Sequence, residues 1–401
     1  MPSSSANAMA EPAGPPQVGG RGFRSLTVVS LLMAMVALLL AACGPTSSDA
    51  FVKRSGTSFT VDGAPFRFVG YNLYDGAASD IFSCSPSTRL DDTALADTLR
   101  AAREEGGATV IRFWAFATYT ADGSDFSGMD RFIAAARREG LRVMPVLEDG
   151  PGNCSTGERN VPLSQVDGGQ WYSGGYRQPL GRASISYRDY ARLVAEHYRD
   201  EPAILGWTMV NEAETSERQP DGRTPLVAFA GDMAAVLHQA DPNHLVTLGT
   251  QGNGAPGNSG SDFHNIYVQA GLDFTEVHDW NRYGSDTEAL PGSVDGRLPA
   301  PDSDECRSRT ARVACSFAIS RAIDKPIVVG EVGITATDGP SRQRRASLIT
   351  AKARAAFSAG GAGYLVWHLD RGQTDRLDVQ TSPLDPVVPA LARVASELNR
   401  T

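Results

Sequence analysis

The sequence has no basic excess: its 401 residues include 37 lysines and arginines against 46 acidic residues, which gives a formal net charge of −9. Without a basic patch, nucleic acid is not an expected partner. The sequence also has no internal repeat, linker or break in composition between residue 51 and its end, so we predict a single domain there. Its hydrophobic content of 41% is enough for one sizeable core.

The sequence also has no apolar run long enough to cross a membrane. The run near the N-terminus, from Leu26 to Leu40, is shorter than the ~20 residues that a spanning helix needs. Arg21 and Arg24 precede this run, and small residues follow it. A basic flank, a short apolar centre and small residues are typical of a secretory signal peptide. An uncleaved membrane anchor is the alternative interpretation.

The end of the apolar run, Leu40-Ala41-Ala42-Cys43, resembles a bacterial lipobox. This resemblance implies cleavage before Cys43 and attachment of lipid to its sulfur. We therefore predict a lipoprotein-type signal peptide over residues 1–42 and a polar tether over residues 43–50. The mature protein is then exported, and either anchored in the cell membrane by its lipid on the extracellular face or secreted.

Cysteine is scarce, with five residues and no CxxC pair or neighbouring histidine pair to indicate a metal site. Beyond Cys43, four cysteines remain, and an even number in an exported protein is typical of two disulfides. We favour Cys306–Cys315, which closes a short loop, and Cys84–Cys154, which would join two loops on one face. Free buried thiols are the alternative.

Short apolar runs alternate with segments of helical period from Phe59 to the C-terminus, which is the pattern of a parallel α/β sheet. An Asp-Gly turn at residues 62–63 predicts a β-hairpin that closes the barrel floor and runs into the first strand. Eight strands with intervening helices predict one (β/α)8 barrel, the TIM barrel, with long loops at its C-terminal face. The predicted strands lie within residues 66–72, 108–114, 141–147, 203–210, 244–248, 273–278, 325–330 and 363–367. The predicted helices cover residues 90–105, 129–139, 187–198, 226–240, 341–358 and 387–399.

Two long segments, residues 150–184 and 282–304, lack periodicity and are rich in glycine, proline and aspartate. Segments of this length are usually functional loops or disordered. Both follow the carboxyl ends of predicted strands, so we interpret them as walls of a substrate cleft. Trp171 in the first segment, with Tyr172 and Tyr176, could stack on sugar rings or form the loop's own small core.

Two of the predicted strands end in a carboxylic acid. One run ends in Asn211-Glu212, and a second apolar run ends in Glu331. In a parallel barrel, residues at the carboxyl ends of strands point into the mouth of the barrel. Each acid alone is more often a helix cap or a salt-bridge partner, but two acids at two strand ends are what cleavage of a glycosidic bond requires.

Six segments in this order resemble glycoside hydrolase family 5 and its clan A relatives, especially the β-mannanase-like members. The resemblance covers nearly the whole chain after the predicted tether. Its segments are residues 66–72 (FRFVGYN), 110–116 (VIRFWAF), 207–212 (WTMVNE), 273–280 (DFTEVHDW), 325–333 (KPIVVGEVG) and 364–368 (YLVWH).

The resemblance implies a retaining mechanism in which Glu212 is the general acid/base and Glu331 is the nucleophile. Such a mechanism needs the two carboxyl groups about 5–5.5 Å apart, with their pKa values separated by their environments. The resemblance also implies that Arg112 lies near Glu331 and favours its ionised form. Asn211 is implied to bond the 2-hydroxyl of the sugar.

Five further residues complete the predicted substrate-binding set. The resemblance implies that His278 and Trp280 flank the nucleophile and that Trp367 forms the floor of the sugar subsite beside the cleaved bond. Trp114 and Asp149, at the ends of the second and third strands, face the same mouth; Asp149 could instead cap the next helix. Family 5 enzymes usually have tyrosine two residues after the histidine, where this sequence has Trp280, so subsite shape and substrate preference are open. His278 and Trp280 could also be structural residues.

The sequence therefore predicts a retaining β-glycoside hydrolase with a carbohydrate substrate, and β-mannan is the best single choice. Another envelope or plant glycan, such as β-glucan or galactofuranan, is an open alternative, and so is a non-catalytic glycan-binding lipoprotein. No metal or organic cofactor is expected, because both catalytic groups are carboxyls. We expect a monomer whose membrane contact is its N-terminal lipid.

Overall fold

The computed structural model describes residues 49–85, 89–149, 154, 168–280, 285–370 and 376–400. The predicted signal peptide, the lipidation site Cys43 and residues 43–48 of the tether lie outside these residues, as do parts of the two long loops. Within the described ranges, no helix combines the length and the apolar character that crossing a membrane requires.

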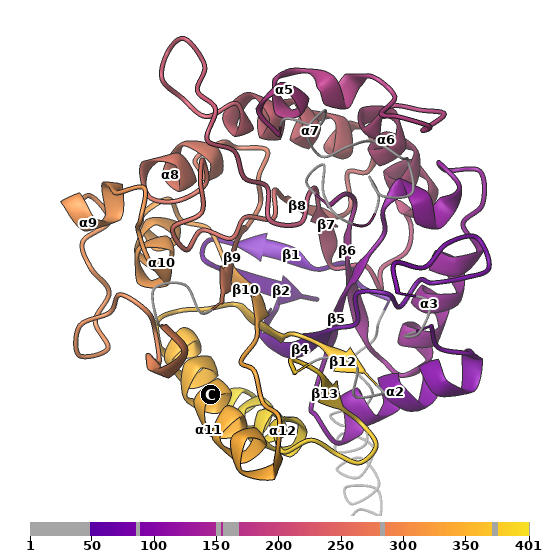
Figure 1. Ribbon diagram of the computed structural model, residues 1–401, viewed down its shortest axis with the longest axis vertical. Helices are drawn as coiled ribbons and strands as arrows, with labels where there is room; N and C mark the ends of the chain where they lie inside the picture. The colour runs from indigo at the N-terminus through magenta and orange to yellow at the C-terminus, as the bar shows by residue number, and fades with distance from the viewer. Residues whose placement is uncertain are drawn as a thin grey trace, which may run out of the picture. The chain divides into compact units, whose positions relative to one another are not determined.

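Eight parallel strands form the central sheet, in the order β8-β7-β6-β5-β4-β11-β10-β9. Figure 1 shows these strands arranged in a ring with the helices outside it. The predicted (β/α)8 barrel is therefore confirmed. The strands are β4 (Phe68–Asn72), β5 (Val110–Trp114), β6 (Arg142–Val146), β7 (Gly206–Thr208), β8 (Leu245–Thr247), β9 (Thr275–Asp279), β10 (Ile327–Val332) and β11 (Gly363–Val366).

The ring is completed between β8 and β9 by individual hydrogen bonds instead of a continuous ladder. The backbone N–H of Asp273 donates to Val246 O at 2.8 Å, and the carboxylate of Asp273 accepts the N–H of Val246 at 2.8 Å. Further along, the N–H of His278 donates to Gln251 O at 2.9 Å. A side chain therefore supplies part of the pairing that backbone supplies elsewhere in the barrel.

In the described residues, the six predicted helices are present, and α6 and α7 begin and end at the predicted residues. The short helices α5, α8 and α9 were not predicted. The helix α10 was not predicted, because eight consecutive residues from Val313 to Ser320 are buried and leave no amphipathic period to detect. The helices are α2 (Asp92–Glu104), α3 (Ser127–Arg138), α5 (Gly168–Ser173), α6 (Tyr187–Tyr198), α7 (Leu226–Ala240), α8 (Ser261–Tyr267), α9 (Asp304–Arg307), α10 (Val313–Ala322), α11 (Gly339–Ser358) and α12 (Val387–Leu398).

The predicted hairpin is present and has a third strand: β1 (Lys53–Ser55), β2 (Ser58–Val61) and β3 (Ala64–Phe66) pair antiparallel. Asp62 and Gly63 both have positive φ, which the tight turn between β2 and β3 requires. Phe59 of β2 is fully buried against Phe68, the first residue of β4, and Phe274, which directly precedes β9. The hairpin therefore closes one end of the barrel, as predicted. A short pair, β12 (Leu369–Asp370) and β13 (Val379–Gln380), lies outside the barrel.

Both predicted disulfides are present, Cys84–Cys154 and Cys306–Cys315. They join positions 70 and 9 residues apart in the sequence. Structural disulfides persist in oxidising compartments, so the pairings fit an exported protein.

Candidate active site

A bulge in β10 aims Glu331 into the barrel. Val328 packs in the interior cluster, so strict alternation would direct Gly330 inward and Glu331 outward. The pairing with β9 instead shifts between Val329 and Glu331, which brings Glu331 opposite His278. Bulges commonly redirect a side chain beside a functional site. The redirected carboxyl is almost fully buried, with 3% of the side chain exposed.

Glu212 reaches the same point from the loop after β7. Its backbone is in the left-handed region, with φ at 50°, which is rare for a residue with a side chain. His278 Nδ1 lies 2.8 Å from its Oε1, and Gln251 Nε2 donates to the same oxygen at 3.0 Å. One carboxyl oxygen of Glu212 and one of Glu331 lie within 4.8 Å of each other. The side chain of Glu212 is 31% exposed, so it faces the open side of the site.

Arg112 is the centre of the buried network. Its Nη1 donates to Glu331 at 2.7 Å and to Asn72 at 3.1 Å, and its Nη2 donates to Asn211 at 2.8 Å. Its Nε lies 3.1 Å from Glu276. The guanidinium is fully buried, so these interactions act in a low dielectric where charge pairs are strong. The contact with Glu331 is the one that the resemblance implied.

Glu276 belongs to this network, although the sequence gave no reason to assign it a role. It lies on β9 between Arg112 and His278 Nε2, which is 3.2 Å away, and accepts from Thr208 at 3.2 Å. A Cβ at Gly330 would lie 2.2 Å from Glu276 Oε1, so the glycine leaves the space that the carboxyl fills. One signal went unused: an acidic residue within a predicted buried strand is expected to be paired, because glutamate is almost never fully buried otherwise.

The network contains five ionisable groups whose charges nearly balance: Arg112, His278, Glu212, Glu276 and Glu331. Burial lowers the pKa of His278, but the carboxyls of Glu331, Glu212 and Glu276 outweigh it and raise the pKa to about 9. At neutral pH the network therefore has three carboxyls against two cations, Arg112 and His278. The shortest contact of His278 is with Glu212, so the proton on Nδ1 lies in the hydrogen bond to that carboxyl.

The two acids differ in pKa, in an order that the sequence did not predict. Burial raises the pKa of Glu331 above its usual range, and the lowering by His278 and Arg112 does not offset it. Burial also acts to raise the pKa of Glu212, but the hydrogen bonds from His278 and Gln251 outweigh it and lower the pKa overall. In the free protein, proximity to Arg112 alone does not make Glu331 the more acidic group.

Trp280 occupies the position where the family usually has tyrosine, and its indole N–H donates to Glu331 Oε2 at 3.2 Å. A Cβ at Gly333 would lie 2.3 Å from the indole ring, so this glycine makes room for the larger side chain. The substitution thus keeps a donor on the carboxyl while filling more of the site. The interpretation of Trp280 as only a core ring does not account for this hydrogen bond.

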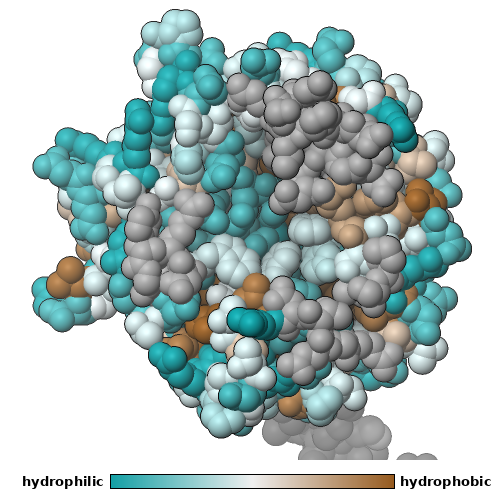
Figure 2. All heavy atoms as spheres, in the orientation of Figure 1, coloured by the Kyte–Doolittle hydropathy of each residue, from teal (hydrophilic) through white to brown (hydrophobic). Residues whose placement is uncertain are grey.

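Three half-buried aromatic rings lie beside the acids on the C-terminal face, the face formed by the carboxyl ends of the strands. Tyr74 stacks on Trp367, with centroids 5.5 Å apart and planes at 8°, and Trp114 lies 4.6 Å from Tyr74. The Trp114 indole N–H is buried with no hydrogen-bond partner among the described residues. Such a surface offers apolar ring faces to a ligand. Figure 2 shows hydrophilic residues gathered at the centre of this face.

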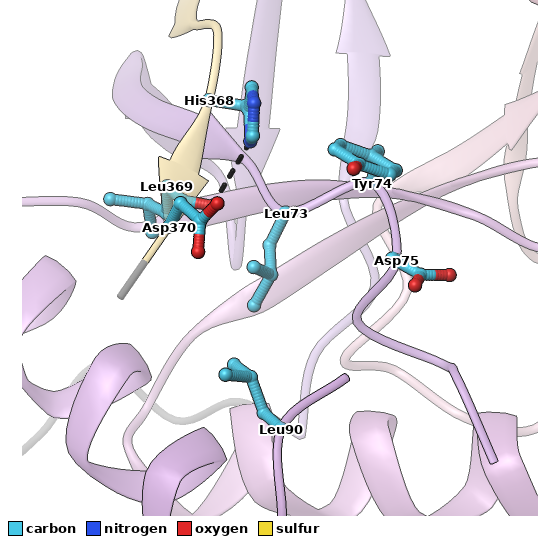
Figure 3. Close-up of a pocket in the computed structure, with 7 residues that line it drawn as sticks. All are labelled: Leu73, Tyr74, Asp75, Leu90, His368, Leu369 and Asp370. Carbon is cyan, nitrogen blue, oxygen red and sulfur yellow. Dashed lines mark hydrogen bonds between the residues drawn. The ribbon is translucent and has the colours of Figure 1, made fainter. Parts of the chain in front are cut away.

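A small hollow beside Tyr74 is too small to be a sugar subsite. Figure 3 shows Leu73 and Leu90 facing each other across it, with Tyr74 and His368 above. Its volume is about 10 Å³, which is room for one water molecule. The aromatic surface, and not this hollow, is therefore the part of the site that can contact a large ligand.

Asn211 and Asp149 lie together at the edge of the network. Asn211 accepts from Arg112 through Oδ1, which turns its amide N–H group toward Asp149 Oδ1, 3.5 Å away. The carboxylate of Asp149 also accepts the backbone N–H of Cys154 at 3.4 Å. The structure thus brings both residues beside the acids, and their contacts with sugar stay predictions.

The structure places Trp171 in a cluster of aromatic rings, and its contact with substrate stays a prediction. Its ring packs against Tyr172, Tyr176, Tyr187 and Phe229, and only 5% of the residue is exposed. This is the alternative that the sequence left open, a small core built by the loop. Helix α5 places the ring against α7, where it contacts Phe229.

Glu212, His278 and Glu331 are close enough to be considered as ligands for one metal ion, since one atom of each lies within 4.8 Å of the others. Two features oppose this. The pKa of His278 is raised to about 9, so a metal ion would have to displace a proton before the imidazole could bind it. Arg112, 2.7 Å from Glu331, already neutralises one carboxyl. The donor set fits a hydrogen-bonded acid pair better than a metal centre.

The raised pKa of His278 predicts a loss of stability at alkaline pH. Its pKa is about 9 in the folded chain and ~6.5 unfolded, so its stabilisation is complete below pH ~6.5 and is lost as pH rises through 9. We expect the free energy of unfolding to fall by up to ~3 kcal/mol across this range, measured by urea denaturation. Lys325, whose pKa burial lowers to about 8, acts in the opposite direction, so the comparison is with His278→Gln. A slope that is the same in wild type and His278→Gln, with exposed His264→Gln as control, would contradict the assignment.

Comparison with known proteins was made on sequence and on structure. Residues 186–358 match the family described as "GH family 5 beta-mannosidase-like". "Probable mannan endo-1,4-beta-mannosidase C" of Aspergillus terreus is 28% identical over 286 residues, which cover 59% of this chain and 66% of that protein. "Mannan endo-1,4-beta-mannosidase 3" of Arabidopsis thaliana is 26% identical over 369 residues, 80% of this chain and 82% of that protein. The chain thus spans about two thirds of the length of the first and about four fifths of the second.

The endo-1,4-beta-mannanase from Rhizomucor miehei superimposes with a TM-score of 0.62 at 18% identity, covering 87% of this chain and 100% of that one. The endo-beta-1,4-mannanase from Thermotoga petrophila gives 0.62 at 19% identity, covering 83% of this chain and 77% of that one. At these identities the likeness supports the barrel fold.

Proposed function

Because residues 186–358 belong to the β-mannosidase-like group of glycoside hydrolase family 5, we propose that the chain is a retaining β-glycoside hydrolase acting on β-mannan. The observation that carries the proposal is the separation of the acids: carboxyl oxygens of Glu212 and Glu331 lie within 4.8 Å. Retaining enzymes have carboxyls about 5–5.5 Å apart, whereas inverting enzymes need about 6.5–9.5 Å to admit a water molecule between them.

The reaction has two displacements. In the first, a Glu331 oxygen forms a bond to the anomeric carbon while the bond from that carbon to the leaving oxygen breaks, and Glu212 gives its proton to that oxygen. In the second, Glu212 takes a proton from water, the water oxygen bonds to the anomeric carbon, and Glu331 leaves. Arg112 and Trp280, which donate to the two oxygens of Glu331, hold its carboxylate in position for attack.

Substrate binding must reorder the two pKa values, because Glu212 has to be protonated when the glycosidic bond breaks. Glu331 is already buried, whereas Glu212 is 31% exposed, so a sugar that covers the site desolvates mainly Glu212. Desolvation raises the pKa of a carboxyl. His278, bonded to Glu212 at 2.8 Å, holds the proton that Glu212 then takes up.

The substrate assignment rests on the relatives and on the aromatic surface. Both relatives reported above are named as mannan endo-1,4-beta-mannosidases. Tyr74, Trp114 and Trp367 offer apolar ring faces that suit the CH face of a pyranose, and Asn211 is placed to bond a hydroxyl. Trp280 narrows the site compared with tyrosine, so preference among mannans and related glycans is expected to depend on it.

A substrate panel tests the proposal. We expect the purified full chain to release reducing sugar from β-mannan faster than from β-glucan, xylan or galactofuranan, with Glu212→Gln as the matched inactive control. Turnover of only another glycan would change the assigned substrate but would leave the proposed mechanism unchanged. Binding of β-mannan without turnover, by a chain that unfolds cooperatively, would show a glycan-binding protein instead.

We also propose that the protein is held at the cell surface by lipid on Cys43, on the basis of the Leu40-Ala41-Ala42-Cys43 motif. The two disulfides fit the same oxidising location. Mass spectrometry of the N-terminal peptide from membranes would find diacylglyceryl-modified Cys43; an unmodified thiol there would contradict the anchor.

A further inference from the structure

A second hollow lies at the rim of the C-terminal face, where the loops after β7, β8 and β9 meet. Its volume is about 310 Å³, and four arginines and two aspartates are among its lining residues: Arg218, Arg223, Arg307, Arg309, Asp221 and Asp262. Figure 1 shows α8 and α9 side by side in this region, and Figure 2 shows hydrophilic residues over it. Loops that extend from barrel strands at this face are where substrate-binding groups lie.

The charges in this hollow do not cancel. Arg218 pairs with Asp262 at 2.8 Å, and Arg223 pairs with Asp221 at 2.6 Å. In the described part of the chain, the guanidinium groups of Arg307 and Arg309 have no ion pair. The hollow therefore has an excess of two positive charges in a chain whose formal charge is −9.

The backbone of the loop that contains the two unpaired arginines is held in place, while both residues are exposed. The disulfide Cys306–Cys315 closes the loop that contains both of them. That loop packs against the start of α8: a Cβ at Gly260 would lie 2.0 Å from Ser308 O, and Ser261 Oγ donates to Arg307 O. A rigid scaffold that keeps like charges together favours a bound counter-charge.

A buried hydroxyl in the same hollow also lacks a partner. Ser259 lines it and is only 2% exposed, and its Oγ has no hydrogen-bond partner among the described residues. Buried polar atoms nearly always have a hydrogen-bond partner, so this hydroxyl can bond an oxygen that enters the hollow. Arginines and a hydroxyl together are suited to the oxygens of a carboxylate or a phosphate.

We propose that this hollow binds an anionic oxygen group carried by a saccharide, a uronate carboxylate or a phosphate ester. The inference rests on the proposed function, and it extends the substrate class from neutral β-mannan to chains with acidic substituents. Segments 211–224 and 249–262 connect the rim hollow to the region of Glu212. Asn258 donates to Ala213 O, beside Glu212, and the Thr215 N–H donates to Pro256 O. The rim site thus shares two loops with Glu212 and its hydrogen-bond partner Gln251, whereas Glu331 lies on β10.

Binding tests the anion site without any need for turnover. The full chain is titrated calorimetrically with glucuronate, with inorganic phosphate and with mannose, at low salt. We expect glucuronate to bind, mannose not to bind at this site, and the Arg307→Ala/Arg309→Ala variant to bind glucuronate at least about tenfold more weakly. The matched control is Arg138→Ala/Arg393→Ala, which removes two exposed arginines on α3 and α12 and should bind as wild type. Equal binding by all three proteins, or binding of neither anion by the wild type, would overturn the proposal. Binding of phosphate without glucuronate would identify the group as a phosphate ester and exclude the uronate.

Turnover then separates the two proposals. On a uronate-substituted manno-oligosaccharide, Arg307→Ala/Arg309→Ala should raise KM about tenfold with little change in kcat, and on the neutral oligosaccharide it should change neither. A change of equal size on both substrates would contradict a site for the acidic group. If no glycan is turned over but glucuronate binding still depends on the two arginines, the proposed hydrolase activity fails and the anion site stands.

Discussion

Replacing Glu331 by alanine is expected to lower turnover on the preferred glycan by a factor on the order of 10⁴ or more, because the variant has no group that can bond to the anomeric carbon. Binding should change far less, since the aromatic surface of Tyr74 and Trp367 is unaffected. Initial rates and a separate binding measurement give the two quantities. Glu331→Gln, similar in shape, should lose activity equally and so shows that charge and nucleophilicity matter more than packing.

The roles of the two acids can be distinguished by adding azide to each alanine variant with an activated aryl β-glycoside. In Glu331→Ala, azide enters the space of the missing carboxyl and attacks directly, which should give the α-glycosyl azide. In Glu212→Ala, azide attacks the sugar already bonded to Glu331, which should give the β-glycosyl azide. The opposite pairing of variant and product would exchange the assigned roles, and rescue of neither would contradict double displacement.

Arg112→Met is expected to give the largest loss of stability in the chain, about 3–5 kcal/mol by urea denaturation. The reason is that the side chains of Glu276 and Glu331 are 0% and 3% exposed and would be left buried without their shared cation. The loss is mainly the cost of uncompensated carboxyls, and only in part that of the lost hydrogen bonds to Asn72 and Asn211.

A second substitution tests this explanation. Arg112→Met/Glu276→Gln removes one of the two uncompensated charges, so it should be more stable than the sum of the two single variants predicts, by about 1–3 kcal/mol. The control pair is Arg112→Met with Asp385→Asn, whose carboxyl pairs with Arg345 in a separate buried contact. That pair should be additive; coupling of the same size in both pairs would show a general loss of packing instead.

The barrel could be predicted from the sequence because the alternation of buried strands and amphipathic helices is a local pattern. The helices α6 and α7 show this, since both begin and end at the predicted residues. The helix α10 was missed for the converse reason, because burial on all sides removes the period. Trp171 was undecided because an aromatic residue in a loop looks the same in sequence whether it packs inward or contacts a ligand.

The candidate site also has features that could be predicted from the sequence and features that could not. The acids Glu212 and Glu331 could be identified because each follows an apolar run. The inward direction of Glu331, however, depends on a β-bulge that the residue pattern does not predict. Glu276 was quoted within a motif and given no role, because its importance comes from Arg112 and His278, which only the folded barrel brings together. The order of the two pKa values depends on burial and shared protons, which are properties of the assembled network.

The contact between Gly330 and Glu276 limits which residues can occur at these two positions in related sequences. Any side chain at position 330 would occupy the place of the Glu276 carboxyl, since even a Cβ would come within 2.2 Å of it. Conversely, a small residue at position 276 alone would leave a void beside Arg112. In related sequences, we therefore expect these two residues either to be conserved together or to be substituted together. An alignment of such sequences should show positions 276 and 330, which are 54 residues apart, as a correlated pair.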